Sequence, residues 1–315
     1  MKIVVLMGGN SSEREVSLNS GRAVAEGLRE AGHEVEALDI ASVAEVTRLP
    51  QLAQLKDADV VFPALHGGQG EDGHLQAVLE VLGIPFALSG HTASALAMDK
   101  GAAKRIMRSA GIPTPDWLQV TVPLNRRLKV EHIQDRAGDE LGFPVVIKLN
   151  GSGSSVGVEI VHDPTEFAEA FTRIAELGTK EKLDVLIEKF IPGRELTATI
   201  FLGRRLPLLE IRPRAGFYDF ANKYTDGASE YLVPAPVHSP VYEQISADAL
   251  RVFELLGCRG VARADFRLDG DHYSCLEINT IPGMTHNSLV PKAAAAVGIS
   301  FSALVDDLCR SAVEN

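Results

Sequence analysis

The sequence has few cysteines, few aromatic residues and no long apolar run. It holds 3 cysteines and 1 tryptophan in 315 residues, and aromatic residues make up 6% of the chain. The cysteines are widely spaced, without a zinc-binding pattern or a disulfide framework, which is typical of a reducing cytoplasm. No apolar stretch approaches the length that spans a bilayer, so a membrane protein is not expected.

Basic residues are in the minority. The chain has 31 Lys and Arg against 42 Asp and Glu, a net charge of −11, which argues against nucleic acid as the main partner. A nucleotide ligand is still compatible with this charge, because a phosphate site is built from local cations and backbone N–H groups. The N-terminal MKIVVLMGGNSS has a short apolar run followed by Gly-Gly, which predicts a buried strand and not a signal peptide.

The residues present describe an ordinary globular protein. Apolar residues make up 45%, and the length allows two or three domains with their own cores. Residues 1–90 predict an open α/β unit with a parallel sheet, whose ligands bind at the C-terminal ends of the strands. The pattern predicts strands at Lys2–Met7, His33–Leu38 and Val60–Ala64, and helices at Glu13–Ala31 and Gly73–Leu82.

Two glycine-dense loops follow strands in this unit. In the first, residues 8–12, Ser12 is predicted to cap the helix with Glu15 at the capping-box position. This loop lacks the G-x-G-x-x-G spacing, which disfavours a nicotinamide-dependent oxidoreductase. The second, residues 66–73, suggests a backbone that lies close to a ligand, although glycine also simply makes loops.

The middle of the chain carries the pattern of a phosphate site. A helix is predicted from Met98-Asp99-Lys100 to Ala110, and a strand at residues 143–148 ends in Lys148. A Gly/Ser loop at residues 151–157 comes next. One point charge beside unshielded backbone N–H groups suits a polyphosphate; the alternative is a simple hairpin turn.

Three later segments add to this picture. The strand Asp184–Phe190 puts donors and acceptors beside apolar surface at Glu188, Lys189, Phe190 and Ile191, a pattern that fits an adenine edge, and Glu195 follows within reach of a ribose. Ordinary strand residues are the alternative. Residues 212–232 form a long segment with three tyrosines, which predicts a lid. Residues 291–313 are predicted to be helical.

Residues 260–289 predict a hairpin with one polar face. Val261, Ala264, Phe266 and Leu268 alternate with Arg263, Asp265 and Arg267, and Leu276 and Ile278 alternate with Glu277 and Asn279. Asp265 and Glu277 can share a face only if opposed residue numbers have an even sum, so we expect an odd-length loop or a bulge. Asp265, Glu277 and Asn279 are hard oxygen ligands that suit Mg²⁺, with Arg263 beside them as a partner for a carboxylate or an oxyanion. A merely solvated strand face is the alternative.

Together these motifs resemble those of the D-alanine–D-alanine ligase family of the ATP-grasp superfamily, over nearly the whole chain. The segments that carry the resemblance are GGNSSEREVSLNSG (8–21), ALHGGQGEDG (64–73), SALAMDK (94–100), GSSVG (153–157), LIEKFIPGRELT (186–197), FYDFANKY (217–224), RADF (263–266) and LEINTIPGMT (276–285). Any one would be modest evidence, whereas all of them in this order are highly specific.

The resemblance implies an α/β (α+β) ATP-grasp fold of three domains. They are an open parallel α/β N-terminal domain at residues 1–91, a central domain at 92–182, and a C-terminal domain at 183–315 that carries the metal site and the lid at 212–232. The last two grip ATP between them. It also implies a cytoplasmic homodimer that uses ATP and two Mg²⁺ ions, with Mn²⁺ as a substitute, to phosphorylate one D-alanine and join it to a second for peptidoglycan synthesis.

The resemblance further implies roles for individual residues. Glu13 receives the first substrate's ammonium near His66, and Ser154 and Tyr224 join Glu13 in a hydrogen-bonded set. Arg263 and the backbone at Gly283 stabilise the oxyanion, and Ser288 and Leu289 hold the second substrate. The ATP-binding set is Lys100, Lys148, Ser155, Glu188, Lys189, Phe190, Ile191, Glu195, Phe217 and Lys223, and the metal set is Asp265, Glu277 and Asn279.

The sequence departs from the family pattern at two places. Leu149 replaces the usual proline after the phosphate lysine, and the basic residue that often precedes GSSVG is absent from Asn150-Gly151-Ser152. After PGMT, relatives commonly have a small residue and then a histidine, whereas this chain has His286 first. The role of the relatives' histidine is therefore not transferred to His286.

Two alternatives keep the fold. A D-alanine–D-lactate ligase would lack the pair seen here as Lys223-Tyr224, and a non-catalytic nucleotide-binding protein would be expected to lose one of Asp265, Glu277 or Asn279. The Lys223-Tyr224 pair and all three of the metal-set residues are present, which disfavours both alternatives.

Overall fold

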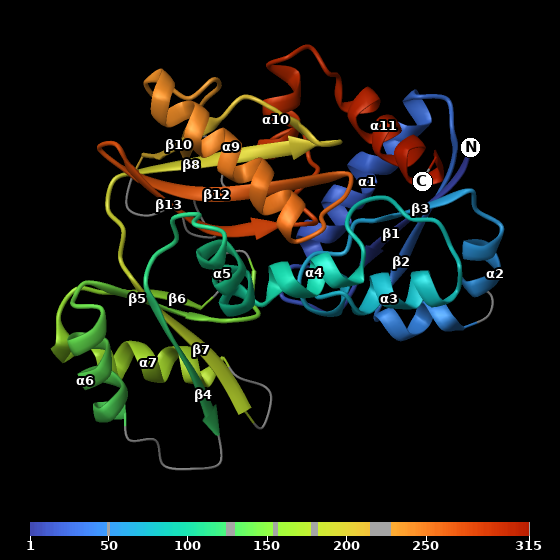
Figure 1. The fold of residues 1–315 in the computed structure, drawn as a ribbon. Helices are drawn as coiled ribbons and strands as arrows, with labels where there is room; N and C mark the ends of the chain where they lie inside the picture. Colours follow the sequence, from blue (N-terminus) through green and yellow to red (C-terminus); the bar gives the residue numbers. More distant parts are fainter. Residues whose placement is uncertain (49–50, 124–129, 154–156, 178–181, 215–227, 315) are drawn as a thin grey trace.

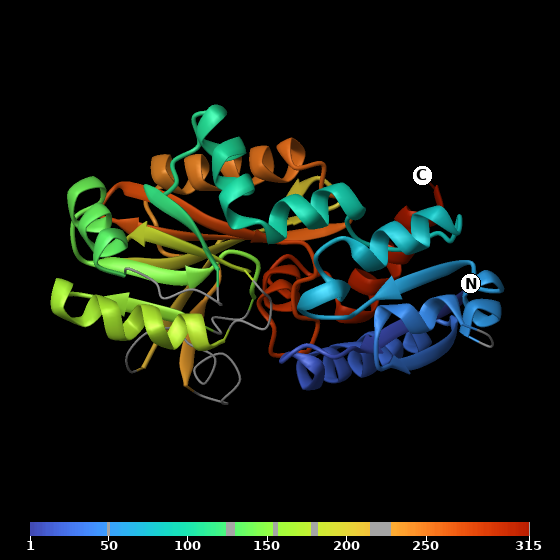
Figure 2. The same cartoon turned by 90° about the horizontal axis from the view of Figure 1, so that it is seen from below.

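The computed structural model describes residues 1–48, 51–123, 130–153, 157–177, 182–214 and 228–314. Their strands form three sheets of three, four and six strands. In Figures 1 and 2 the three-stranded sheet lies to one side of the two larger sheets, α4 lies between the two regions, and α5 lies beside the larger sheets. No helix in these ranges is both long and apolar enough to cross a bilayer.

The N-terminal sheet is parallel, in the order β2-β1-β3, with β1 at Lys2–Gly8, β2 at Glu34–Ile40 and β3 at Val60–Pro63. Ile3 to Met7 are all buried, which a continuous apolar run predicts for a strand covered on both faces. One face packs on α1 (Arg14–Glu30) and on α11 (Phe301–Glu314), which returns from the C-terminus. The other packs on η1 (Val43–Thr47), α2 (Gln51–Lys56) and α3 (His74–Val81), with η2 (Gly68–Gly70) in the loop before α3.

The middle sheet is antiparallel, in the order β4-β7-β5-β6. Its strands are β4 (Trp117–Pro123), β5 (Val145–Leu149), β6 (Val158–Val161) and β7 (Lys182–Lys189). Helices α6 (Val130–Glu140) and α7 (Phe167–Glu176), the latter after η3 (Pro164–Glu166), cover one face. In α7 the buried residues Phe167, Ala170, Phe171 and Ile174 have the helical spacing that produces one apolar face.

The largest sheet is antiparallel, in the order β11-β10-β8-β12-β13, with β9 also on β8. Its strands are β8 (Arg194–Phe201), β9 (Arg204–Arg205), β10 (Leu209–Pro213), β11 (Ser229–Leu232), β12 (Val261–Asp269) and β13 (His272–Asn279). One core joins it to α4 (His91–Met98), α5 (Lys100–Ser109) and α9 (Ser239–Leu255). Figure 1 shows α9 running along this sheet. The short α10 (Leu289–Ala295) follows the loop after β13.

The β12–β13 hairpin contains the predicted bulge. Asp269 pairs with His272, an odd sum, while Asp265 pairs with Glu277, an even one, and the register shifts between Asp265 and Phe266. The bulge therefore puts Asp265 and Glu277 opposite each other on one face, although the turn itself has only two residues. On the other face Ala264, Phe266 and Leu268 are buried in one core, whereas Val261 belongs to the core of the N-terminal sheet.

Several sequence-based expectations need correction. Helix α1 is capped at Glu13 and not at Ser12, with no side-chain cap bond; instead Ser11 accepts from the Glu13 N–H at 3.1 Å and donates to the His66 carbonyl at 2.6 Å. The C-terminal helical segment is two helices, α10 and α11, because the chain turns at Gly298 with φ +81°.

The ends of the segment predicted as a lid are strands, β10 and β11, which pair with each other; residues 215–227 lie outside the described residues. The predicted domain division at residues 182 and 183 falls at the first residue of β7, whose other seven residues stay in the middle sheet. β7 is held in the middle sheet by its pairing with β4 and β5, which are distant in sequence. The division into three domains itself stays a prediction.

Candidate active site

A cavity of about 690 Å³ opens where the three sheets meet. The start of α1, the loop after β3, the end of α4, the loop after β5 and the hairpin β12–β13 with its following loop all contribute walls. Its lining includes Glu13, Asn19, Ser20, His66, Glu71, Lys100, Ser152, Gly153, Arg263, Glu277, Asn279, Thr280, Gly283, Thr285, Asn287, Ser288, Leu289 and Lys292.

Glu13 marks one corner of the cavity and is buried. Two glycines bring backbone against its carboxylate: a Cβ on Gly67 would lie 2.7 Å from Glu13 Oε2, and one on Gly153 would lie 3.0 Å from the same atom. Gly67 also has a φ of +70°, which favours glycine. The loop after β3 and the Gly/Ser loop after β5 therefore meet at Glu13.

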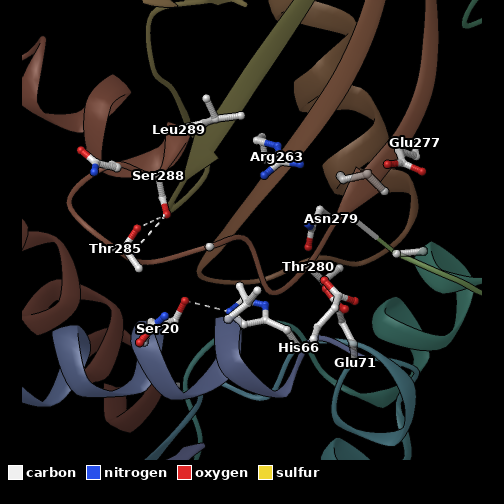
Figure 3. A pocket seen from close by; sticks show the side chains of 18 of the residues that line it. Ser20, His66, Glu71, Arg263, Glu277, Asn279, Thr280, Thr285, Ser288 and Leu289 are labelled. Carbon is white, nitrogen blue, oxygen red and sulfur yellow. Dashed lines mark hydrogen bonds between the residues drawn. The ribbon is translucent and has the colours of Figure 1, made fainter. Parts of the chain in front are cut away.

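His66 and Ser20 form the floor beside this corner (Figure 3). His66 Nε2 lies 3.0 Å from Ser20 Oγ, and Ser20 Oγ also accepts from the Met284 N–H at 3.4 Å. Burial lowers the pKa of His66 to about 4, the charge of Arg263 acts in the same direction, and a backbone hydrogen bond at Ile281 opposes both. His66 is therefore a neutral imidazole at physiological pH.

Glu71 is a second buried carboxyl in this corner. Burial, and then the negative charge of Glu13, raise the pKa of Glu71 to about 8, against the opposing effects of the Gly67 N–H, Lys100 and Arg263. The Gly67 N–H donates to Glu71 Oε2 at 2.8 Å. Glu71 is thus largely protonated at neutral pH and adds little negative charge to that of Glu13.

The hairpin face carries paired charges. The Arg263 guanidinium donates to both oxygens of Asp265, at 2.8 Å each, and Lys100 Nζ lies 3.4 Å from Glu277 Oε2. Lys100 also donates to the Ser152 carbonyl at 2.5 Å, and Asn279 Oδ1 accepts from the Ile281 N–H at 3.1 Å. This face can therefore offer carboxylate and amide oxygens to a cation and ammonium or guanidinium groups to an anion.

The loop after β13 closes the opposite side of the cavity. Ser288 Oγ accepts from the Thr285 N–H at 3.0 Å and lies 2.9 Å from Thr285 Oγ1 (Figure 3). A Cβ on Gly283 would lie 3.0 Å from Ser288 Oγ, so glycine lets the loop backbone approach this hydroxyl. Arg263 and Asn279 also line the cavity.

The other predicted ATP residues that the structure describes lie around β5, β7 and β8, outside this lining. Glu188 Oε2 is 2.8 Å from Lys148 Nζ, and both side chains are buried. The Phe190 N–H donates to the Pro144 carbonyl at 3.1 Å, while the exposed Lys189 uses its N–H on the Asp116 carbonyl at 2.9 Å. Glu195 Oε2 lies 3.4 Å from Arg267 Nη1, and the Ile191 carbonyl accepts from Arg267 Nε at 3.2 Å.

The predicted site residues thus divide into three sets. The cavity lining brings together Glu13, His66, Lys100, Arg263, Glu277, Asn279, Gly283, Ser288 and Leu289. Asp265, Lys148, Glu188, Lys189, Phe190, Ile191 and Glu195 lie outside it, and Ser154, Ser155, Phe217, Lys223 and Tyr224 lie outside the described residues. Within the described ranges no group of three or more His, Cys, Asp or Glu side chains is arranged to hold a metal; the predicted metal set has two carboxylates and one amide.

Sequence reasoning missed several residues of the site. Ser20 could have been found, since Glu13, Val16 and Ser20 repeat at helical spacing and all three line the cavity. Glu71 stood out only as part of a glycine-dense loop. Lys104 and Arg267 gave no sequence signal, because their carboxylate partners Glu188 and Glu195 are more than 70 residues away.

Comparisons with known proteins agree with this geometry. The family model described as D-ala D-ala ligase C-terminus matches residues 106–310, and the model described as D-ala D-ala ligase N-terminus matches residues 41–89. A D-alanine–D-alanine ligase of Desulforudis audaxviator is 46% identical over 328 residues, covering 99% of each chain. One from Syntrophotalea carbinolica is 43% identical over 311 residues, covering 99% of this chain and 96% of the other.

A solved structure adds the fold. The D-alanine–D-alanine ligase of Bacillus anthracis complexed with ATP matches with a TM-score of 0.84 and 34% identity, covering 100% of this chain and 98% of that one. The predicted α/β ATP-grasp fold and the family resemblance are confirmed. With one family model matching about two thirds of its length, this chain belongs to the D-alanine–D-alanine ligase family.

Proposed function

We propose that this enzyme uses ATP to join two D-alanine molecules into D-alanyl-D-alanine, through a D-alanyl phosphate, for peptidoglycan precursor synthesis. The observation that carries the proposal is the cavity itself. It has a buried carboxylate at one end, Glu13, the cations Arg263 and Lys100 at its centre, and a hydroxyl held by a tight loop at the other end, Ser288. Two D-alanine zwitterions and a phosphoryl group between them match this arrangement: an ammonium binds at Glu13, the phosphoryl group near the cations, and a carboxylate at Ser288.

The first D-alanine binds with its ammonium at Glu13. A protonated Glu71 and a neutral His66 support this role, because neither competes for the cation or repels it. The carboxylate of this substrate then faces Arg263 and Lys100, which lie across the cavity on the hairpin and on α5. Phosphorylation makes that carboxylate electrophilic, and the two cations balance the negative charge that accumulates there.

The second D-alanine binds its carboxylate at Ser288 and at the backbone of Leu289, the first residue of α10. Its ammonium first loses a proton to solvent, and the free amine attacks the carbonyl carbon of the acyl phosphate and produces a tetrahedral oxyanion. Arg263 and the N–H of Gly283 are the donors for this oxyanion, because both line the cavity between the two substrate positions. Phosphate then leaves with the electrons of the C–O bond and takes up the proton that the attacking nitrogen releases, and the new amide remains.

The oxygen donors of the hairpin fit Mg²⁺, and Mn²⁺ as a substitute. Asp265 and Glu277 oppose each other in the β12–β13 register, Asn279 follows on the same strand, and their side chains keep access to solvent, which a hard cation with bound water requires. When bound, Mg²⁺ neutralises charge on the transferring phosphoryl group. Lys100 and Lys148 hold phosphates, and Glu188 to Ile191 with Glu195 hold adenosine.

The test is ADP release with Mg²⁺ and ATP in the presence of D-alanine, of L-alanine, or of D-alanine with D-lactate, with the products identified by mass. We expect ADP release that depends on D-alanine and a D-alanyl-D-alanine product. A depsipeptide as the main product at neutral pH would replace this proposal with a D-alanine–D-lactate ligase. No turnover with any of these substrates would overturn the function and leave the fold.

Two further proposals concern the whole protein. A cytoplasmic location is supported by Cys258, Cys275 and Cys309, which are all free and buried. A homodimer is expected from the family resemblance, and light scattering of the purified enzyme measures it directly.

A further inference from the structure

Lys104, in helix α5, is a fully buried lysine that the proposed mechanism does not use. Its exposed fraction is 0%. Its ammonium donates to Thr114 Oγ1 at 2.7 Å and to the Pro115 carbonyl at 3.2 Å, lies 3.0 Å from Glu188 Oε1, and sits 5.3 Å from the centre of the Trp117 ring. A buried ammonium is costly unless it is paired, so this arrangement calls for an explanation.

Lys104 shares its carboxylate with Lys148. Glu188 Oε1 faces Lys104 and Oε2 faces Lys148, at 3.0 and 2.8 Å. The pairing of β5 with β7 sets Val146 opposite Glu188 and Lys148 opposite Leu186, which puts Lys148 and Glu188 on one face of the middle sheet. Helix α5 brings Lys104 to this face from the other side of the carboxylate.

The charges of this trio do not cancel. Burial lowers the pKa of Lys104, whereas the charge of Glu188 opposes this effect and two oxygens, Thr114 Oγ1 and the Pro115 carbonyl, accept from the ammonium. Two ammonium groups then share one carboxylate, which leaves one positive charge in a site that water hardly reaches. The next anion that acts on Lys148 is Glu277, and a third ammonium, Lys100 Nζ, lies 3.4 Å from its Oε2, so one positive charge is still in excess. Glu188 does stay ionised: burial alone would raise its pKa, but Lys148 and then Lys104 outweigh burial and lower it.

We propose that Lys104 is a positioning residue for ATP. Its ammonium balances the negative charge of Glu188, so that Lys104, Glu188 and Lys148 together keep a net positive charge for the phosphates. This inference rests on the proposed function in one respect, that Lys148 binds phosphate. Without Lys104, Lys148 and Glu188 would form a neutral pair with little attraction for an anion. With Lys104, the carboxylate orients Lys148 and the trio still carries the charge that a polyphosphate needs.

A purely structural role predicts something different. Lys104 also ties α5 to the segment at Thr114 and Pro115, so its removal loosens that contact whatever happens at Lys148. Loss of this anchor should weaken adenosine and ADP to the same extent. Loss of charge should weaken only the ligand that carries phosphate.

The experiment measures the dissociation constants of ADP, with Mg²⁺, and of adenosine by calorimetry on the full chain without D-alanine. For Lys104→Met we expect ADP to bind about tenfold more weakly, the order of a lost unit charge at several ångströms in a medium of effective dielectric constant ~20. Adenosine should change by less than about twofold on the same reasoning, since it carries no charge. Arg105→Met is the matched control, because it removes a cation from the next position of α5, where the side chain is exposed and contacts Gln119.

The double variant Lys104→Met with Glu188→Gln provides the decisive arm. It removes one positive and one negative charge, so the ratio of ADP to adenosine affinity should return toward that of the wild type. An equal loss of ADP and adenosine affinity in Lys104→Met, or no recovery of the ratio in the double variant, would overturn the inference.

Glu188→Gln alone covers the case in which Lys104→Met does not fold. It raises the net charge of the trio by one, so the ADP to adenosine ratio should increase; an unchanged or lower ratio would overturn the inference. These measurements need no turnover, so a chain that binds ADP as expected yet forms no dipeptide would refute the proposed function alone. A wild-type chain that binds neither ligand would refute both.

Discussion

Replacing Asp265 by asparagine tests whether the hairpin face is a metal site. In the structure both oxygens of Asp265 accept from Arg263, from Nε and from Nη2, at 2.8 Å each. Asparagine keeps the size of the side chain and one acceptor oxygen but removes the charge. The substitution therefore affects two functions at once, the ion pair with Arg263 and the proposed ligation of Mg²⁺.

The structural part of the effect is modest. One hydrogen bond between charged groups is lost, and such a bond contributes ~1.5–3 kcal/mol. The side chains of Arg263 and Asp265 are 13% and 16% exposed, so the pair is only slightly screened. We expect the free energy of unfolding to fall by about 2 kcal/mol, which leaves the enzyme folded. Turnover should fall on the order of a hundredfold or more, the effect of removing one electrostatic contact to a developing charge.

The assay follows D-alanine-dependent ADP release while Mg²⁺ is varied. Asp265→Asn should lose turnover and require more Mg²⁺ for half-maximal activity. Asp269→Asn is the matched control, because it makes the same change at the exposed end of β12, and both quantities should stay at wild-type values. Wild-type turnover in Asp265→Asn with an unchanged Mg²⁺ requirement would refute the metal site, and lost turnover with that requirement unchanged would leave Asp265 only as the partner of Arg263.

Three further predictions concern packing, ionisation and the second substrate. Gly21→Ala should lower the free energy of unfolding by about 1–3 kcal/mol in chemical denaturation, because the new Cβ would lie 2.5 Å from Met7 Cβ; unchanged stability would mean that α1 moves freely against β1. The folded-state pKa of Glu71, about 8, lies above its usual 4.5, so wild-type stability should fall as pH rises between these values; Glu71→Gln should flatten that slope, and equal slopes would contradict the raised pKa. Ser288→Ala should raise the KM for the second D-alanine by about tenfold to a hundredfold, the loss of one hydrogen bond to a charged group, with the KM for ATP as the internal control. An equal rise in both KM values would indicate a general disturbance of the loop.

The repeating local patterns of the chain were readable in advance. Alternation in residues 261–268 and 276–279 predicted the hairpin, its two faces and the need for a bulge, because side chains in a strand point to opposite sides with a period of two. The continuous apolar run at residues 3–7 predicted β1 for a different reason, because a strand covered on both faces buries every side chain. Short glycine-dense segments after strands predicted loops, and in the structure Gly67 and Gly153 lie against Glu13; that these loops contact a ligand stays a prediction. In each case the signal lies within a few residues of the chain.

Only the tertiary structure decided which distant residues meet. Glu13 and Gly153 are 140 positions apart, and nothing local indicates that the loop after β5 approaches the start of α1. The helix cap moved from Ser12 to Glu13 because Ser11 is held by the His66 carbonyl of another loop. The ion pairs of Lys104 and Arg267 gave no signal in the sequence. A buried or partly buried cation needs a carboxylate partner, and these partners, Glu188 and Glu195, lie on other strands that are distant in sequence. Period and turn chemistry act over a few residues, whereas charge pairing and burial depend on how separate segments pack.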